Sequence, residues 1–220
     1  GKPRQHTELE LVPVGANKQS KDMRLWAIAN GRGNFRFKNI PNGEYTLSVN
    51  FGETPSRSSP YPTVFFPKEK LRANARVFRV IPGSNQAGLR FQLPPSLPRK
   101  RVSGKVTWSN GKPIRYAYVS LVDLEYKMMA FGEYKTNSRG RFSMSGFSNR
   151  SYRVHVVLYD SPKLHLYSKP AAMGHSEIFF LNEKTKPLKI VLKKIVEPLP
   201  NNLGLFRYDS LTKPIDLLEK

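Results

Sequence analysis

The sequence contains no cysteine, which excludes disulfide bonds and thiolate metal sites. Histidine is scarce as well, and no two of the four (His6, His155, His165 and His175) lie at a spacing typical of a metal site. A phosphate-binding glycine loop is also missing, because residues 31–33 read as a turn. We therefore predict no catalytic residues, no cofactor, no metal site and no enzymatic activity.

Long apolar runs are missing too. The longest are a handful of residues, such as 178–181, whereas a membrane-spanning helix needs roughly 20. The first residues do not read as a signal peptide, although a processed chain would have lost one. These features leave the location of the protein open.

Acidic residues are few beside the basic ones. The chain has 37 Lys and Arg against 16 Asp and Glu, a formal net charge of +21. Such a surplus predicts an anionic counterpart, which could be nucleic acid, lipid headgroups, an acidic glycan or an acidic protein. A generic basic surface is the plainer alternative. Without a helix for the major groove or a paired aromatic RNA-binding motif, sequence-specific nucleic-acid recognition is not predicted.

The abundant residues are those of strands and turns. Ten Tyr and thirteen Phe favour strands, while eighteen Pro and fifteen Gly interrupt helices and mark turns. The composition therefore predicts an all-β fold.

A duplication organises the chain. The segment Asn30–Phe35 recurs as Asn137–Phe142, 107 positions later, and each copy continues with alternating apolar residues across a turn. Tyr45 and Tyr152 keep the same offset. This alternation around a turn is typical of a β-hairpin, so we expect one hairpin in each copy. The apolar residues of each copy would pack between two sheets.

The second copy has one strand that the first copy lacks, at residues 102–108. We therefore expect two tandem seven-strand-type antiparallel β-sandwiches, the first without its first strand. Either upstream residues have been removed from the chain, or the first sandwich exposes an edge that invites pairing with another chain.

These features predict four segments. The first sandwich covers residues 1–95, a Pro-containing linker covers 96–100, the second sandwich covers 101–195, and an apolar tail covers 196–220. The basic surplus is shared by the two sandwiches, and the tail is nearly neutral.

The motifs of both copies resemble the carboxypeptidase regulatory-like domain. They are residues 102–106, 111–114, 117–121 and 137–142 in the second copy, with matching residues from Gly1 onward in the first. The resemblance covers residues 1–195 and implies a transthyretin-like β-sandwich that serves as an accessory, adhesive or structural module of bacterial envelope or secreted proteins. It therefore implies an exported, periplasmic or extracellular location. A fold of this kind does not specify a function by itself.

Two apolar features suggest contact with a protein partner. Tyr61, Phe65 and Phe66 lie in a stiff Pro-containing loop and would make good contact anchors, unless the two Phe fold under the sandwich edge. Leu205, Phe206 and Tyr208 lie in a tail that is too apolar to stay in water, so it should dock on the second sandwich or on another subunit.

The candidate anion-facing residues alternate with apolar neighbours or lie between the modules. They are Arg36, Arg90, Arg99, Lys100, Arg101, Arg139, Arg141 and Arg153. The same alternation places His155 on the water-facing side of its strand.

Together these residues predict a non-enzymatic accessory or structural subunit of a bacterial envelope assembly. It would bind an acidic protein, or an anionic membrane surface or glycan, through basic sandwich faces. The alternative is a free-standing module that binds acidic glycan, lipopolysaccharide or nonspecific nucleic acid.

Overall fold

A computed structural model describes residues 4–16, 24–125, 128–160 and 170–195 of the chain. It is all-β, as predicted, and the described residues add one short 3-10 helix, η2 (Arg72–Asn74). Contacts divide the chain into two units, unit 1 (Gly1–Pro98) and unit 2 (Arg99–Lys220). Within the described part, no helix has the length and apolarity needed to cross a membrane.

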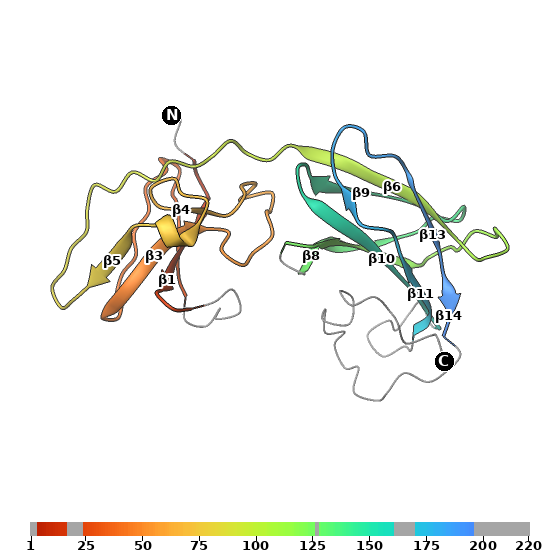
Figure 1. The fold of residues 1–220 in the computed structure, drawn as a ribbon, viewed down its shortest axis with the longest axis horizontal. Coiled ribbons are helices and arrows are strands. Elements are labelled where there is room, and N and C mark those ends of the chain that lie inside the picture. The colour runs from red at the N-terminus through yellow and green to blue at the C-terminus, as the bar shows by residue number, and fades with distance from the viewer. Residues whose placement is uncertain (1–3, 17–23, 126–127, 161–169, 196–220) are drawn as a thin grey trace. The chain divides into compact units, whose positions relative to one another are not determined.

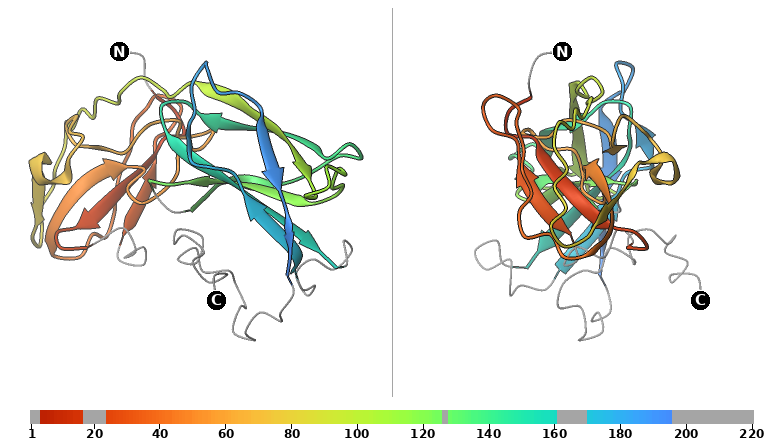
Figure 2. Two further views of the ribbon diagram at one scale, coloured as in Figure 1. Left: turned by 45° about the vertical axis from the view of Figure 1, so that its right-hand side comes forward. Right: turned by 90° about the vertical axis from the view of Figure 1, so that its left-hand side faces the viewer.

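Unit 2 is a complete two-layer sandwich (Figure 1). Its strands are β6 (Arg99–Thr107), β7 (Tyr118–Asp123), β8 (Met128–Lys135), β9 (Arg141–Phe147), β10 (Ser151–Tyr159), β11 (Pro170–His175), β12 (Phe179–Phe180), β13 (Leu188–Val191) and β14 (Lys193–Lys194). One sheet has the order β14-β11-β10-β7-β8, with β12 paired to β10, and the other has the order β13-β6-β9. The two layers can be followed in Figure 2.

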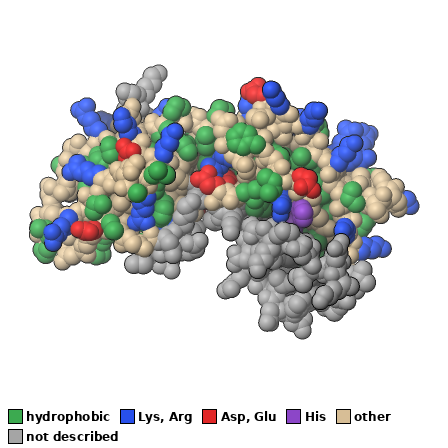
Figure 3. Space-filling model, in the orientation of Figure 1, with side chains coloured by type: hydrophobic (Ala, Val, Ile, Leu, Met, Phe, Trp, Pro, Cys, Tyr) green, Lys and Arg blue, Asp and Glu red, His purple; other side chains and the backbone are tan. Residues whose placement is uncertain are grey.

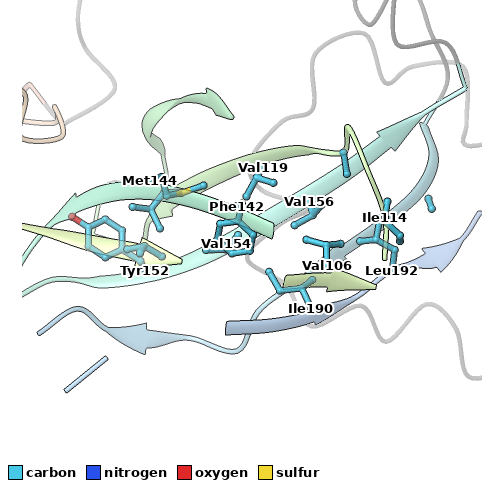
Figure 4. Packing of buried hydrophobic residues seen from close by; sticks show 14 of the residues in the cluster. Val106, Ile114, Val119, Phe142, Met144, Tyr152, Val154, Val156, Ile190 and Leu192 are labelled. Atoms are coloured by element: carbon cyan, nitrogen blue, oxygen red, sulfur yellow. The ribbon is translucent and has the colours of Figure 1, made fainter. Parts of the chain in front are cut away.

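The core of unit 2 lies between these two sheets. Strand alternation places every second residue inward, so Val102 and Val106 of β6 are buried while their neighbours are not. They belong to one cluster with Val154 and Val156 of β10 and with Ile190 of β13. Figure 4 shows Val106 among these residues. Apolar side chains from opposite sheets therefore hold the layers together.

Strand β6 is the centre of the three-stranded sheet. It pairs antiparallel with β9 along residues 99–105 and parallel with β13 along residues 104–107. The parallel pair departs from the purely antiparallel sandwich that we expected. Arg99 and Lys100, which the sequence assigned to the linker, belong to β6 and lie opposite Phe147 and Gly146.

The expected hairpin of the second copy does not form. Strand β9 pairs with β6 in one sheet and β10 pairs with β7 in the other, so the turn at 148–150 carries the chain between layers. Tyr152 closes this turn, because its hydroxyl donates to the Phe147 carbonyl and accepts from the Phe147 N–H, both at 3.1 Å. In unit 1 the Tyr45 hydroxyl closes the corresponding turn by donating to the Pro41 carbonyl at 3.0 Å.

Unit 1 has a single sheet among its described residues. Its strands are β1 (Glu8–Pro13), β2 (Leu25–Ile28), β3 (Gly43–Val49), β4 (Val64–Phe65) and β5 (Val77–Val80). Their order is β2-β1-β3-β4, with β5 also paired to β3. The segments that correspond to β9 and β13, residues 34–40 and 89–93, are not strands here. The second layer of unit 1 is thus present without paired strands.

The repeated turn is the same in both units. The Asn30 side-chain oxygen accepts from the N–H groups of residues 32 and 34 at 2.9 and 3.0 Å. The Asn137 oxygen accepts from residues 139 and 141, at 3.0 Å each. Gly33 and Gly140 have φ values of +75° and +69°, as this turn requires. The two copies of the repeat therefore share the hydrogen bonds of this turn.

Candidate interaction sites

Most candidate anion-facing side chains are exposed. Exposed members are Arg36, Arg90, Arg99, Arg101, Arg139 and Arg141. Lys100 and Arg153 are partly buried, and Lys100 pairs with the exposed carboxylate of Glu183. On the face drawn in Figure 3, Lys and Arg side chains are spread over both units and acidic ones are fewer. Contact of these residues with an anion stays a prediction.

The strand registers of unit 2 place three cations in a row. Lys105 of β6 lies opposite Arg141 of β9 on one side and opposite Lys189 of β13 on the other. All three side chains are exposed. We call these three residues the cationic row. The exposed Arg101 stands on the same outer face of β6 and donates to the Ser143 hydroxyl at 2.9 Å.

The sequence did not reveal this row, and Lys105 was not among the candidates. Like charges directly opposite one another on neighbouring strands destabilise a sheet. Arg141 and Lys189 lie 36 and 84 positions from Lys105 along the chain, so only the strand registers bring the three charges together.

A second feature of unit 2 combines aromatic and basic groups. A groove of about 350 Å³ is lined by Arg115, Tyr116, Tyr118, Leu158 and Tyr159. The Tyr118 and Tyr159 rings meet edge to face with centroids 5.4 Å apart. Lys135 Nζ lies 4.6 Å from the Tyr118 centroid, a cation–π distance. We call this feature the tyrosine groove.

His155 is more enclosed than the sequence indicated. Instead of facing water it is partly buried, in a small recess with Val122, Leu124, Arg153 and His175. Burial, and then the positive charge of His175 and Arg153, lowers the pKa of His155 from 6.5 to about 4. The neutral imidazole is therefore the form present near pH 7.

The aromatic loop residues proposed as partner anchors are buried. Tyr61, Phe65 and Phe66 are 4%, 3% and 6% exposed. Phe66 packs against Phe78 with ring centroids 5.4 Å apart and against Phe91 at 5.7 Å. Burial of these rings removes more apolar surface from water than contact at a loop tip would. They stabilise unit 1 and are not available as surface anchors.

The other proposed anchors, Leu205, Phe206 and Tyr208, lie outside the described residues. Their docking stays a prediction. The same holds for His165.

Two buried ion pairs were missed by the sequence reading. Arg150 donates from Nε and Nη2 to the two Asp123 oxygens at 2.6 and 2.9 Å, and Arg24 Nη1 donates to Glu10 Oε2 at 3.1 Å. Burial raises the pKa of Glu10 to about 7, although Arg24 and the Phe51 N–H oppose this shift. An apolar–charged–apolar pattern such as Leu9-Glu10-Leu11 reads as a water-facing acid, which is why it gave no signal.

No group of three or more His, Asp or Glu residues positioned for a metal ion occurs among the residues that the structure describes.

No family model and no curated protein matches the chain. Among solved structures, the chain is similar to a Streptococcal ancillary pilin, with 14% identity and a TM-score of 0.45 over 88% of this chain and 58% of that one. A minor pilin of Streptococcus agalactiae gives 12% identity and a TM-score of 0.41, over 91% and 87%. The pilus adhesin SpaC of Lactobacillus rhamnosus GG gives 12% and 0.24, over 90% and 30%.

The chain therefore spans 58% of the length of the first of these structures. TM-scores below 0.5 at such identities do not assign the chain to the pilins, and the resemblance to carboxypeptidase regulatory-like domains stays a prediction.

Proposed function

We propose that the chain is a non-enzymatic accessory or structural subunit of a bacterial cell-envelope assembly, located outside the cytoplasm. It binds an acidic protein or another anionic surface through the basic faces of its sandwiches. The resemblance of both repeats to carboxypeptidase regulatory-like modules supports the envelope location. The cationic row supports the anionic partner.

The energetic argument starts from the like-charge pairs. Lys105 has a cation opposite it on both neighbouring strands, so the sheet is less stable than it would be with neutral residues there. An anion bound to the outer face of β6 would turn this repulsion into attraction. Attraction of this kind mainly raises the rate of encounter and fixes the orientation of a partner.

Binding to acidic vesicles and to an acidic model protein tests this proposal. Serine replacement of the row (Lys105→Ser, Arg141→Ser, Lys189→Ser) should lower affinity by about tenfold, because three exposed ion pairs with the anion at about 0.5 kcal/mol each amount to about 1.4 kcal/mol. A matched control removes three exposed cations of unit 1 (Arg57→Ser, Lys68→Ser, Lys70→Ser), which lowers the net charge equally. Equal losses in both variants would show that only total charge matters and would refute the row as a site.

The apolar tail belongs to the same proposal as the means of holding a protein partner. Deletion of residues 196–220 should then reduce the partner recovered in a pull-down at moderate salt. A chain that recovers no stable partner, and behaves the same without the tail, would contradict the role as a subunit.

A free-standing binder of acidic glycans is the second candidate, and the tyrosine groove favours it. Aromatic rings can stack on the apolar faces of sugars, while Arg115 and Lys135 lie close enough to pair with a carboxylate or sulfate. This candidate predicts that Tyr116→Ala weakens binding of a sulfated oligosaccharide and that tail deletion does not. Binding unaffected by Tyr116→Ala and by added salt would exclude it.

A further inference from the structure

Strand β9 of unit 2 is a long and regular edge strand. The three-stranded sheet has the order β13-β6-β9, so among the described residues β9 pairs with β6 alone. Of the other edge strands described, β2, β5 and β13 have four residues, β4, β12 and β14 have two, and the eight-residue β8 is interrupted by two register shifts. Strand β9 has seven residues, no proline and an unbroken register. It therefore lacks the shortness, proline and bulge that commonly keep an edge from pairing.

The hydrogen bonds at the start of β9 show which of its backbone groups point to the open edge. The Val106 N–H of β6 donates to the Gly140 carbonyl at 2.8 Å. In an antiparallel pair the bonded positions alternate, so Phe142 and Met144 also bond to β6. The N–H and C=O groups of residues 141, 143, 145 and 147 therefore point away from β6, toward the open edge.

The two ends of this open edge are satisfied within unit 2. The Arg141 N–H donates to Asn137 Oδ1 at 3.0 Å, and its carbonyl accepts from the Asn137 N–H at 2.9 Å. The Phe147 N–H and carbonyl both bond to the Tyr152 hydroxyl at 3.1 Å. These contacts confirm that the groups of residues 141 and 147 point away from β6.

Ser143 and Ser145 lie between these ends, and we call them the serine edge. Within the described part of the chain, no hydrogen bond from another segment reaches their backbone N–H or C=O groups. Ser143 is exposed and Ser145 is half-buried, and both side chains are small. The serine edge thus offers two donors and two acceptors, which is a template for an added strand.

The charge around the serine edge is positive. Strands β6, β9 and β13 contain no acidic residue. Their outer face carries five exposed cations, which are Arg99, Arg101, Lys105, Arg141 and Lys189. Opposite charges on neighbouring strands attract and like charges repel, so an acidic strand is favoured there over β9 of a second copy, which would bring the same cations with it.

We propose that an extended segment of the acidic partner protein adds to the serine edge as the fourth strand of this sheet, antiparallel to β9. The inference rests on the acidic protein partner of the proposed function and specifies how that protein binds. The antiparallel direction is the one in which β9 pairs with β6, and it is the more stable per residue.

The register of β9 specifies the side chains of the added strand. Two partner residues in hydrogen-bonded pairs with Ser143 and Ser145 direct their side chains to the outer face of the sheet, and the next residue on that face lies opposite Arg141. The residues between them face inward, beside the buried Met144. The partner segment therefore alternates acidic residues, which face the cations, with apolar ones.

A synthetic peptide of three Glu and three Val in alternation tests the proposal on the 220-residue chain. In the proposed register its Glu residues donate their N–H groups to β9, whereas the N–H groups of its Val residues point to solvent. N-methylation of the three Glu residues should weaken binding by about 30-fold, the equivalent of two average hydrogen bonds. N-methylation of the three Val residues is the matched control, with the same charge and the same number of methyl groups, and should change the affinity less than about twofold. Fluorescence anisotropy at physiological salt measures all three peptides.

Hydrogen exchange locates the added strand on single amides. In the free chain, the amides of Ser143 and Ser145 should exchange faster than those of Phe142 and Met144, which bond to β6. The unmodified peptide should protect the two serine amides and leave the other two unchanged.

A change in the chain itself gives a second measurement. Ser145→Pro removes one donor of the serine edge without changing the charge, at an edge position where proline is tolerated, and should weaken peptide binding by about fivefold. Ser145→Ala keeps the N–H group and should bind the peptide as the wild type does. Thermal melts followed through Trp108 check that unit 2 stays folded in both variants.

Two results would overturn the proposal. Equal affinities of the two N-methylated peptides would mean attraction to the basic face without strand addition. Serine amides that are protected without peptide, in a chain that light scattering shows to be dimeric, would mean that a second copy fills the edge.

The failure of this inference is distinguishable from the failure of the proposed function. If serine replacement of the cationic row abolishes binding of an acidic protein that leaves the exchange of the Ser143 and Ser145 amides unchanged, the row stands as a site and the added strand is excluded. If the row variant and its unit 1 control lose equal affinity, the row fails, while protection of the serine amides by the peptide would still demonstrate strand addition.

Discussion

Burial shifts the pKa of several side chains, among them Glu10, Tyr152 and His155. It raises the pKa of Glu10 to about 7 and that of Tyr152 to about 12, and it lowers the pKa of His155 to about 4. Each of these groups lies on a strand or beside a sheet where water is excluded. Their ionisation is therefore linked to the folding of the unit that holds them.

We expect unit 2 to lose stability on acidification because of His155. The unfolded chain binds a proton at this residue near pH 6.5, whereas the folded unit does so only near pH 4, so the contribution is present above pH 6.5 and is lost as the pH falls toward 4. The loss should be on the order of 3 kcal/mol once the pH is below 4. His155→Gln should remove it, and thermal melts followed through Trp108 in a Trp26→Phe background would measure this.

The control for that measurement is His6→Asn in unit 1, which should leave the acid sensitivity of the Trp108 transition unchanged. Identical slopes of melting temperature against pH for the wild type and His155→Gln would show that His155 does not contribute.

At the scale of elements, a buried ion pair joins β7 to the turn that leads out of β9. Asp123 is the last residue of β7, and Arg150 ends the turn that carries the chain from one sheet to the other. The pair is bidentate and both side chains are at most 4% exposed. It therefore fixes where the two sheets are connected.

Asp123→Ala should destabilise unit 2 by about 3–5 kcal/mol, because Arg150 would lose its bidentate partner and remain a buried charge beside the half-exposed Glu125. Glu183→Ala, which breaks the exposed pair with Lys100, should cause no measurable change. Urea denaturation of both variants, followed through Trp108, compares the two. A loss below about 1 kcal/mol for Asp123→Ala would contradict this role.

The strands also show which features of the fold can be predicted from the sequence. Period-two alternation predicted the strand residues around Phe142 and Tyr152, and the Asn–Gly turns, because these depend on neighbours along the chain. It could not predict that β9 and β10 lie in different sheets, because alternation shows which face of a strand is buried but not which strand it pairs with. The cationic row could not be predicted for the same reason, because it depends on contacts between distant segments, and the burial of Phe65 and Phe66 could be stated only as one of two alternatives.

At the scale of the whole molecule, the two units have separate cores of unequal completeness. Among the residues that the structure describes, the core of unit 2 is enclosed by two hydrogen-bonded sheets, whereas that of unit 1 has one sheet and a second layer without paired strands. The second layer of unit 1 is held by side-chain packing without backbone hydrogen bonds between strands. We therefore expect unit 1 to have a lower free energy of unfolding than unit 2.

Calorimetry should therefore show two transitions, and the lower should belong to unit 1. Trp26 lies in β2 and Trp108 packs against the core of unit 2, so fluorescence of the single-tryptophan variants Trp26→Phe and Trp108→Phe assigns each transition. A fragment of residues 99–195 should reproduce the upper transition by itself. A single transition, or loss of the Trp108 signal before the Trp26 signal, would mean that the second hydrogen-bonded sheet does not make unit 2 more stable than unit 1.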